Sequence, residues 1–143
     1  MRKYGCIGIA ISICLLAGGT ASMFAHHSQA AFEVNKQVTV EGTITQVNWA
    51  NPHSLFFMEG KPAGEGSVQK WALEGPSPTQ LAKEGWSKET LNVGDKITAT
   101  GNPSRSGRPM MLLKEVVTAE GKRMATGATG NFDPSRRGAE PRY

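Results

Sequence analysis

Cysteine is scarce in this sequence, and its position limits the chemistry open to the chain. The two cysteines, Cys6 and Cys14, both lie close to the N-terminus. If export removes that segment, the remaining chain contains no thiol. Disulfides, iron–sulfur clusters, thiolate zinc sites and cysteine nucleophiles are then excluded together.

A strong excess of one charge is also missing. The chain has 16 basic and 12 acidic residues, and loss of Arg2 and Lys3 with an N-terminal segment would lower the net charge from +4 to +2. This balance is too mild to indicate a polyanion partner. A single-stranded nucleic acid would need stacked aromatics in a basic groove, and one loop with Arg105 and Arg108 is a weak match. We therefore expect no nucleic-acid partner.

The residue patterns typical of nucleophilic enzymes are absent as well. No glycine-framed serine elbow occurs, and the three histidines have no obvious carboxylate beside them in the sequence. Glu74 and Glu84 are the carboxylates near the tryptophan-rich middle, and solvent-exposed positions suffice to explain both. We expect a protein that is not an enzyme and assign no catalytic residue.

Residues 1–25 have the three-part layout of a secretory signal peptide, with two basic residues, an apolar run and a segment of small residues. An uncleaved membrane anchor is the alternative, because residues 5–25 carry no charge and about 20 residues span a bilayer. The short leucine-rich part favours the signal peptide. Cleavage after Ala25 would expose His26, whereas cleavage after Ala21 would leave the histidines internal. We expect a periplasmic or secreted protein that contacts the membrane only through an uncleaved signal segment.

The clearest strand pattern covers residues 37–49, in which alternate positions from Val38 to Ile44 are apolar or glycine. The phase then slips, because Val47 and Trp49 have the opposite parity. Together with Gly42 in mid-strand, the slip predicts a bulge or a strong bend. Asn51-Pro52 ends this strand, since proline cannot donate a ladder hydrogen bond.

Later segments supply further strands and one helix. Ser77 as N-cap, Pro78 at the first helical position and Gly85 as C-terminal cap predict a short helix. Four more segments have strand-like patterns: residues 54–58, 68–73, 96–101 and 110–119. Residues 59–67, rich in glycine, are predicted to form a loop.

The order of three strands, a helix and two strands is the pattern of an OB-like fold, a five-stranded Greek-key barrel that is mainly β. A small open α+β sheet or an incomplete sandwich is the alternative. We divide the chain into four parts: a signal peptide (1–25), an N-terminal arm (26–36) that lays Phe32 on the barrel, the barrel domain (37–124) and a disordered tail (125–143).

Three histidines are candidate metal ligands: His26, His27 and His53. If cleavage exposes His26, its α-amine and imidazole can chelate one ion, because a terminal amine has a pKa of only about 7.7–8.0. His53 would then complete a set of nitrogen donors suited to Cu(II), or to Zn(II), provided that the arm folds back onto the corner at Asn51-Pro52. The alternative is that the pair is simply a solvated chain start and that His53 hydrogen-bonds a turn carbonyl. No cofactor is certain.

A second candidate site follows from the fold class, because OB barrels bind ligands on one sheet face and in the loops after strands 1 and 4. Here these loops are residues 50–53 and 102–109. The candidate ligand-binding residues are Trp49, Asn51, Trp71, Arg105 and Arg108. The tryptophans are alternatively core residues, since tryptophan is strongly buried on average.

Several motifs, in this order, resemble a family of small exported bacterial proteins classified only as a domain of unknown function. They are His26-His27-Ser28, Phe32, the strand VTVEGTITQVNW leading into Asn51-Pro52-His53, Trp71-Ala72-Leu73-Glu74, Gly85-Trp86, and Gly94-Asp95 before ITATGNP. The resemblance covers roughly residues 26–124. It implies export and a barrel, and no ligand or mechanism, because the family has no established activity.

These observations predict an exported single-domain barrel that acts as a binding or accessory protein. Its partner would be a small ligand or a protein of the cell envelope. The alternative is a copper-handling protein that uses the three histidines.

Overall fold

The computed structural model describes residues 29–64 and 66–128. Their elements follow the predicted order of three strands, a helix and two strands, with one short strand added at the end. They are β1 (Val38–Asn48), β2 (Leu55–Pro62), β3 (Gln69–Glu74), α2 (Pro78–Lys83), β4 (Lys96–Pro103), β5 (Met110–Thr118) and β6 (Arg123–Ala125). No helix in these two ranges is long and apolar enough to cross a membrane.

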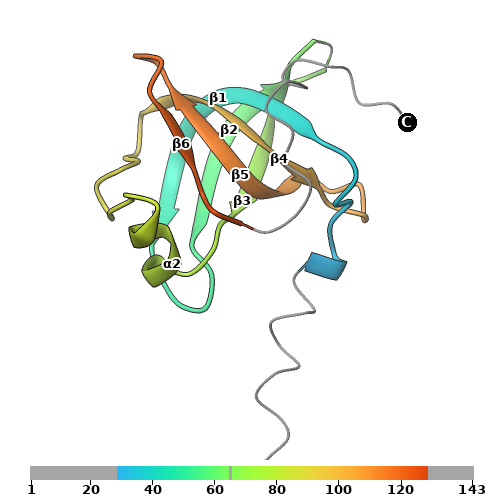
Figure 1. Cartoon of the computed structure of the whole chain (residues 1–143). Coiled ribbons are helices and arrows are strands. Elements are labelled where there is room, and N and C mark those ends of the chain that lie inside the picture. The colour runs from blue at the N-terminus through green and yellow to red at the C-terminus, as the bar shows by residue number, and fades with distance from the viewer. Residues whose placement is uncertain (1–28, 65, 129–143) are drawn as a thin grey trace, which may run out of the picture.

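Five of the strands close into a barrel (Figure 1). Neighbours in the order β3, β2, β1, β4, β5 pair antiparallel, and a parallel pairing of β3 with β5, from Ala72 opposite Met110 to Glu74 opposite Leu112, completes the ring. This mixed, closed barrel with its helix between β3 and β4 confirms the predicted OB-like fold class. Closure removes the open edges that a flat five-stranded sheet would expose.

The bend of β1 lies where the sequence predicted it. The register between β1 and β2 shifts between Ile44 and Gln46, so that Thr45 is the extra residue of a bulge. At Gly42 a Cβ atom would overlap the backbone carbonyl oxygen of Glu59 on β2. A glycine is therefore required at this close approach, and β1 can curve enough to pair with both β2 and β4.

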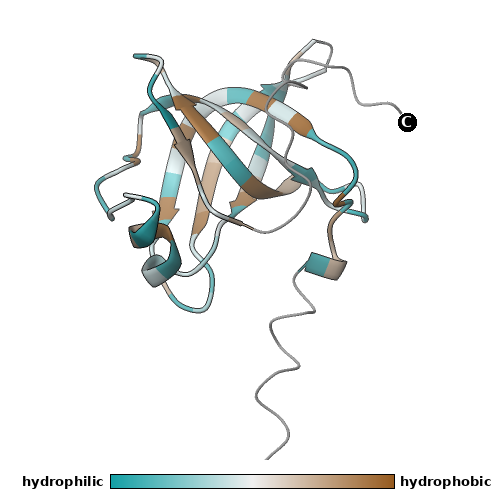
Figure 2. Cartoon of the chain, viewed as in Figure 1, coloured by the Kyte–Doolittle hydropathy of each residue, from teal (hydrophilic) through white to brown (hydrophobic). Residues whose placement is uncertain are grey.

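The barrel interior is filled by the inward-facing residues of every strand. In β5, Figure 2 shows a hydrophilic stretch between two hydrophobic ones. The register with β4 shifts there, which leaves Lys114 as the extra residue of a second bulge. The largest fully buried apolar side chains are Phe32, Phe56, Ile44, Met58, Leu73, Leu81, Met111 and Leu113. Trp71 and Trp86 are buried in the same core, and Trp49 packs against it half-buried.

Helix α2 begins and ends at the predicted residues. Ser77 is the N-cap and its side chain accepts a hydrogen bond from the Gln80 backbone N–H at 3.4 Å, while Gly85 has a positive φ of 81° after the helix. A helix of six residues is marginal by itself. Its single buried residue, Leu81, anchors it to the core.

Two boundaries differ from the expectation. β2 continues beyond Met58 to Pro62, because Glu59, Gly60, Lys61 and Pro62 all pair with β1 although none of them is a typical strand residue. The described chain also continues past Ala125, where the tail was predicted to begin. Ala125 lies in β6, and buried Thr126 donates a hydrogen bond to the Leu113 carbonyl at 2.7 Å. The predicted signal peptide and most of the predicted tail lie outside the described residues.

Candidate functional site

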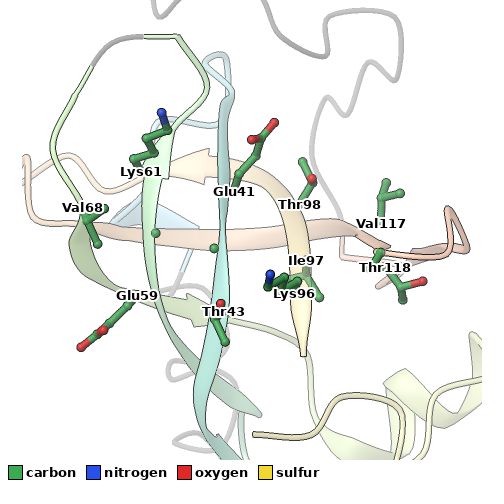
Figure 3. A pocket seen from close by; sticks show the side chains of 13 residues that line it. Glu41, Thr43, Glu59, Lys61, Val68, Lys96, Ile97, Thr98, Val117 and Thr118 are labelled. Atoms are coloured by element: carbon green, nitrogen blue, oxygen red, sulfur yellow. The ribbon is translucent and has the colours of Figure 1, made fainter. Parts of the chain in front are cut away.

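A shallow hollow of about 440 Å³ lies in the outer surface where β1, β2, β4 and the end of β5 run side by side (Figure 3). It lies over the bend of β1, where Gly42 is directly opposite Gly60 on β2. A Cβ on Gly60 would come within 2.6 Å of the Glu41 carbonyl oxygen, so this close approach also depends on a glycine. The glycine pair therefore shapes the surface in which the hollow forms.

The polar lining comes from residues of β1, β2 and β4 that point away from the core. The strand register arranges them in two rows across the sheet. One row contains Lys61, Glu41 and Thr98, and the next contains Glu59, Thr43 and Lys96. Both rows thus bring an acid, a base and a hydroxyl onto neighbouring strands.

The four charged side chains of these rows have no partner among the described residues. Glu41 lies directly opposite Lys61, yet no hydrogen bond or ion pair joins them. Glu59 and Lys96 lie on β2 and β4, on either side of Thr43, and neither has an ion-pair partner among the described residues. Figure 3 shows Glu41 and Lys61 extending in the same direction from neighbouring strands, and Lys96 extending from β4 toward β1. Two positive and two negative groups are therefore available to a bound molecule.

Apolar side chains border the hollow on two sides. Val68 precedes β3 and is 66% exposed, which makes it one of two large hydrophobic residues exposed in the described chain. Val117, on β5, lies half-buried on the other side. The hollow therefore combines separated charges with apolar contact surface.

The corner between β1 and β2 contains three of the predicted site residues. Asn51 is exposed and forms a cis peptide bond with Pro52, and Trp49 packs against the core. His53 places its Nδ1 3.8 Å from Oε1 of Glu74, at the end of β3. The His53 side chain is 38% exposed and that of Glu74 only 12%, so Glu74 is not the solvated surface carboxylate that we expected.

Sequence reasoning missed the contact between Glu74 and His53 because it depends on strand register. Leu55, the first residue of β2, pairs with Glu74, and this register brings His53, two residues earlier, beside the end of β3. The next residue, Ser54, is fully buried, and its hydroxyl has no hydrogen-bond partner in the described chain. The Ser54 hydroxyl is enclosed in the protein, whereas the His53 side chain is partly exposed beside Glu74. The two do not form a nucleophile–base pair.

The loop between β4 and β5 binds the N-terminal arm. Arg105 donates from Nε to the Ala30 carbonyl at 3.0 Å and from Nη1 to the Glu33 carboxylate at 3.3 Å. Buried Asn102 donates from Nδ2 to the Lys36 carbonyl at 2.7 Å. Phe32, which pairs with Ser104 in an isolated bridge, is fully buried, as the sequence suggested. Arg105 therefore holds the arm, while Arg108 is exposed.

The five predicted ligand-binding residues do not converge on one surface. Trp49 and Asn51 lie at the corner after β1, Trp71 lies in the core, and Arg105 and Arg108 lie in the loop after β4. In Figure 1 the corner and the described part of the arm lie on different sides of the barrel, at opposite ends of β1.

Of the three candidate metal ligands, only His53 can be placed. His26 and His27 lie outside the described residues. Within residues 29–64 and 66–128, no three histidine, cysteine or carboxylate side chains come together as a metal site would require.

A second group of charged residues lies on β5 under β6 and the residues that follow it, up to Ala128. Lys114, at the β5 bulge, is 3% exposed and donates to the Ala128 carbonyl at 3.2 Å, and burial lowers the pKa of its ammonium group. Glu115 lies 3.6 Å from Arg123 of β6. These contacts hold residues 123–128 against β5.

No curated protein and no solved structure matches the chain significantly. A protein-family model does match it over residues 14–112, and its description is "Family of unknown function (DUF6152)". The match includes the arm, β1 to β4 and the first residues of β5, and therefore the corner and most of the hollow. Since it covers more than half of the sequence and bears out the resemblance to a family of unknown function, the chain belongs to the DUF6152 family.

Proposed function

We propose that this protein is an exported binding protein, not an enzyme, and that its ligand binds in the hollow over β1, β2 and β4. The observation that carries the proposal is a group of four charges around one concave surface that have no ion-pair partner in the described part of the chain: Glu41, Glu59, Lys61 and Lys96. Ligand sites in proteins are concave and combine apolar contact area with a few placed polar groups. OB barrels use an outer sheet face in this way.

The residue types in the lining favour binding over catalysis. The hollow contains no histidine, and neither Thr43 nor Thr98 has a hydrogen-bonded general base among the described residues. A hydroxyl nucleophile needs such a base to be activated.

Export rests on the N-terminal layout of basic, apolar and small residues. The intact mass of the protein recovered from the periplasm tests it. We expect a chain that starts at Ser22 or at His26, whereas a full-length chain restricted to the membrane fraction would contradict cleavage.

The binding site is tested by screening small molecules against the processed protein for thermal stabilisation. Hits are then mapped by amide chemical-shift changes in NMR spectra. We expect the changes to cluster on β1, β2 and β4 around Thr43 and Thr98, and Lys61→Met to weaken binding. Lys88→Met is the matched control, because Lys88 is an exposed lysine outside the hollow. Shift changes confined to other surfaces, or equal affinity of Lys61→Met and wild type, would contradict the proposal.

A second candidate function is copper or zinc binding by His26, His27 and His53. The specific observation in its favour is Glu74, whose carboxylate lies 3.8 Å from His53 Nδ1. A metal-binding histidine commonly has a carboxylate at its other ring nitrogen, which fixes the ring and raises its basicity. The arm is held at the opposite end of β1 from Gln29 onward, so a shared site requires the segment before Gln29 to reach the corner.

Titration calorimetry with Cu(II) tests this second candidate. We expect His53→Ala to abolish tight binding and Glu74→Gln to weaken it about 10–100-fold, as loss of such a supporting carboxylate does. One extra residue before His26 should also weaken it. Glu89→Gln, an exposed carboxylate paired with Lys88, is the control. Unchanged affinity in His53→Ala would exclude the three-histidine site.

A further inference from the structure

The charges of the hollow point to a particular class of ligand. Two acids and two bases give the lining no net charge, so it does not favour polyanions or polycations. The charges are nevertheless separated, and no ion pair between described residues neutralises them. A net-neutral molecule with separate positive and negative ends is the ligand that such a surface complements.

The register of β1 and β4 places four of the polar residues at the corners of a quadrilateral. Glu41 is opposite Thr98, and Thr43 is opposite Lys96. Glu41 and Lys96 therefore lie on one diagonal, and the two threonines lie on the other. Diagonal neighbours on antiparallel strands are about 7–8 Å apart.

This separation matches a short peptide. Two extended residues span at most about 7 Å, from the amino group to the carboxylate. The ligand's termini would then reach the charged diagonal, while the hydroxyls of Thr43 and Thr98 would flank its central amide, which offers one N–H and one C=O. Val68 and Val117, at the two sides of the hollow, offer apolar contacts to aliphatic side chains.

We propose that the hollow binds a free dipeptide with aliphatic side chains, with the ligand's ammonium group at Glu41 and its carboxylate at Lys96. This inference rests on the proposed function, since it names the ligand class of the same site. The size of the hollow, about 440 Å³, suits such a ligand and lies within the range of small-molecule sites.

The test is titration calorimetry of the processed protein with L-alanyl-L-valine and with its N-acetylated and C-amidated forms. Each capped form loses one charge, and we expect each to bind at least tenfold more weakly, since hydrogen bonds to charged groups are the stronger ones. Glu41→Gln should bind the free and the N-acetylated dipeptide equally, and Lys96→Met should bind the free and the C-amidated dipeptide equally. Lys88→Met should behave as wild type.

Equal binding of the free and capped dipeptides by the wild-type protein would overturn the proposal, as would unchanged selectivity in both variants. If other molecules bind in the hollow and dipeptides do not, the dipeptide assignment is wrong while the proposed binding function stands. If no molecule from the screen shifts the amide signals of the hollow, both fail.

Discussion

Two outer faces of this barrel carry charged residues, and within residues 29–64 and 66–128 only one of the two is covered by another segment. Glu41, Lys61 and their neighbours over β1, β2 and β4 have no covering segment and no partners in the described protein. Lys114 and Glu115 on β5 are buried under β6 and the residues that follow it. The first face is the proposed binding surface, and the second is a contact within the described fold.

Strand alternation alone therefore does not distinguish an open outer face from one that another segment covers. Both faces consist of outward-pointing residues of barrel strands, which a sequence pattern would assign to solvent. What distinguishes them is a short C-terminal segment that returns to β5. Its hydrogen bonds run from Thr126 to the carbonyls of Leu113 and Lys114. Variants on each face test this contrast through their effects on stability.

The largest expected effect is at Gly42, below the open face. In Gly42→Ala the added Cβ would overlap the Glu59 backbone carbonyl, so the two strands must separate. We expect a loss of about 3–4 kcal/mol in the free energy of unfolding, measured by urea denaturation, because backbone overlap at a core strand is among the most destabilising changes.

Gly75→Ala is the matched control for Gly42→Ala. A Cβ at Gly75 would meet its nearest neighbour, a Phe56 side-chain carbon, at 3.5 Å, which is an ordinary contact. It should lose much less stability. If the two variants were equally stable, the hollow would not depend on a glycine at the bend of β1.

A smaller loss is expected when the covering segment is loosened. Thr126→Val removes the hydroxyl that donates to the Leu113 carbonyl at 2.7 Å inside a buried site. We expect about 1–2 kcal/mol of destabilisation and faster hydrogen exchange of the β6 amides.

Thr43→Val makes the same chemical change on the open face, where the hydroxyl has no partner in the described chain. Its stability should change by less than about 0.5 kcal/mol. Equal losses in Thr126→Val and Thr43→Val would remove the distinction between a covered and an open face.

The fold was predictable from the sequence where it depends on neighbouring residues, and less so where it depends on distant ones. Features that depend on neighbouring residues were predicted. The alternation from Val38 to Ile44 predicted β1, the phase slip after Ile44 predicted its bulge, and the caps at Ser77 and Gly85 predicted α2. The parallel pairing of Ala72 with Met110 depends on residues far apart in the chain, and the OB-like order supplied it only by analogy.

The candidate site was less predictable than the fold. The hollow forms because two registers bring Glu41 beside Lys61 and Thr98, and a one-residue slip would turn one set to the other face. The pattern identified the outward side of β1 but not its neighbours. Arg105 appeared available for a ligand because composition does not show that the arm returns to it.

A pH experiment probes the covered face directly. Burial holds the pKa of Lys114 below its usual value of 10.5, so below that pH the unfolded chain binds more protons than the folded one. The free energy of unfolding therefore rises as the pH rises toward 10.5, and it decreases as the pH falls. One proton limits the slope to about 1.4 kcal/mol per pH unit.

Lys114→Met should reduce this slope in urea denaturation between pH 7 and pH 10, while Lys61→Met on the open face should leave it unchanged. Equal slopes in wild type and Lys114→Met would show that the Lys114 ammonium group is solvated. β6 and the residues after it would then not shield this face of β5 from solvent.

The smallest expected change in stability is at Glu41, the acid at the centre of the open face. Because its carboxylate has no partner in the described protein, Glu41→Gln should change the free energy of unfolding by less than about 0.5 kcal/mol. Glu115→Gln, on the covered face, removes a carboxylate 3.6 Å from Arg123 and should be the more destabilising of the two. Urea denaturation of both variants measures this. A binding surface is expected to contain residues that contribute little to stability and much to ligand affinity. A large loss of stability in Glu41→Gln would therefore show that the open face has a structural role.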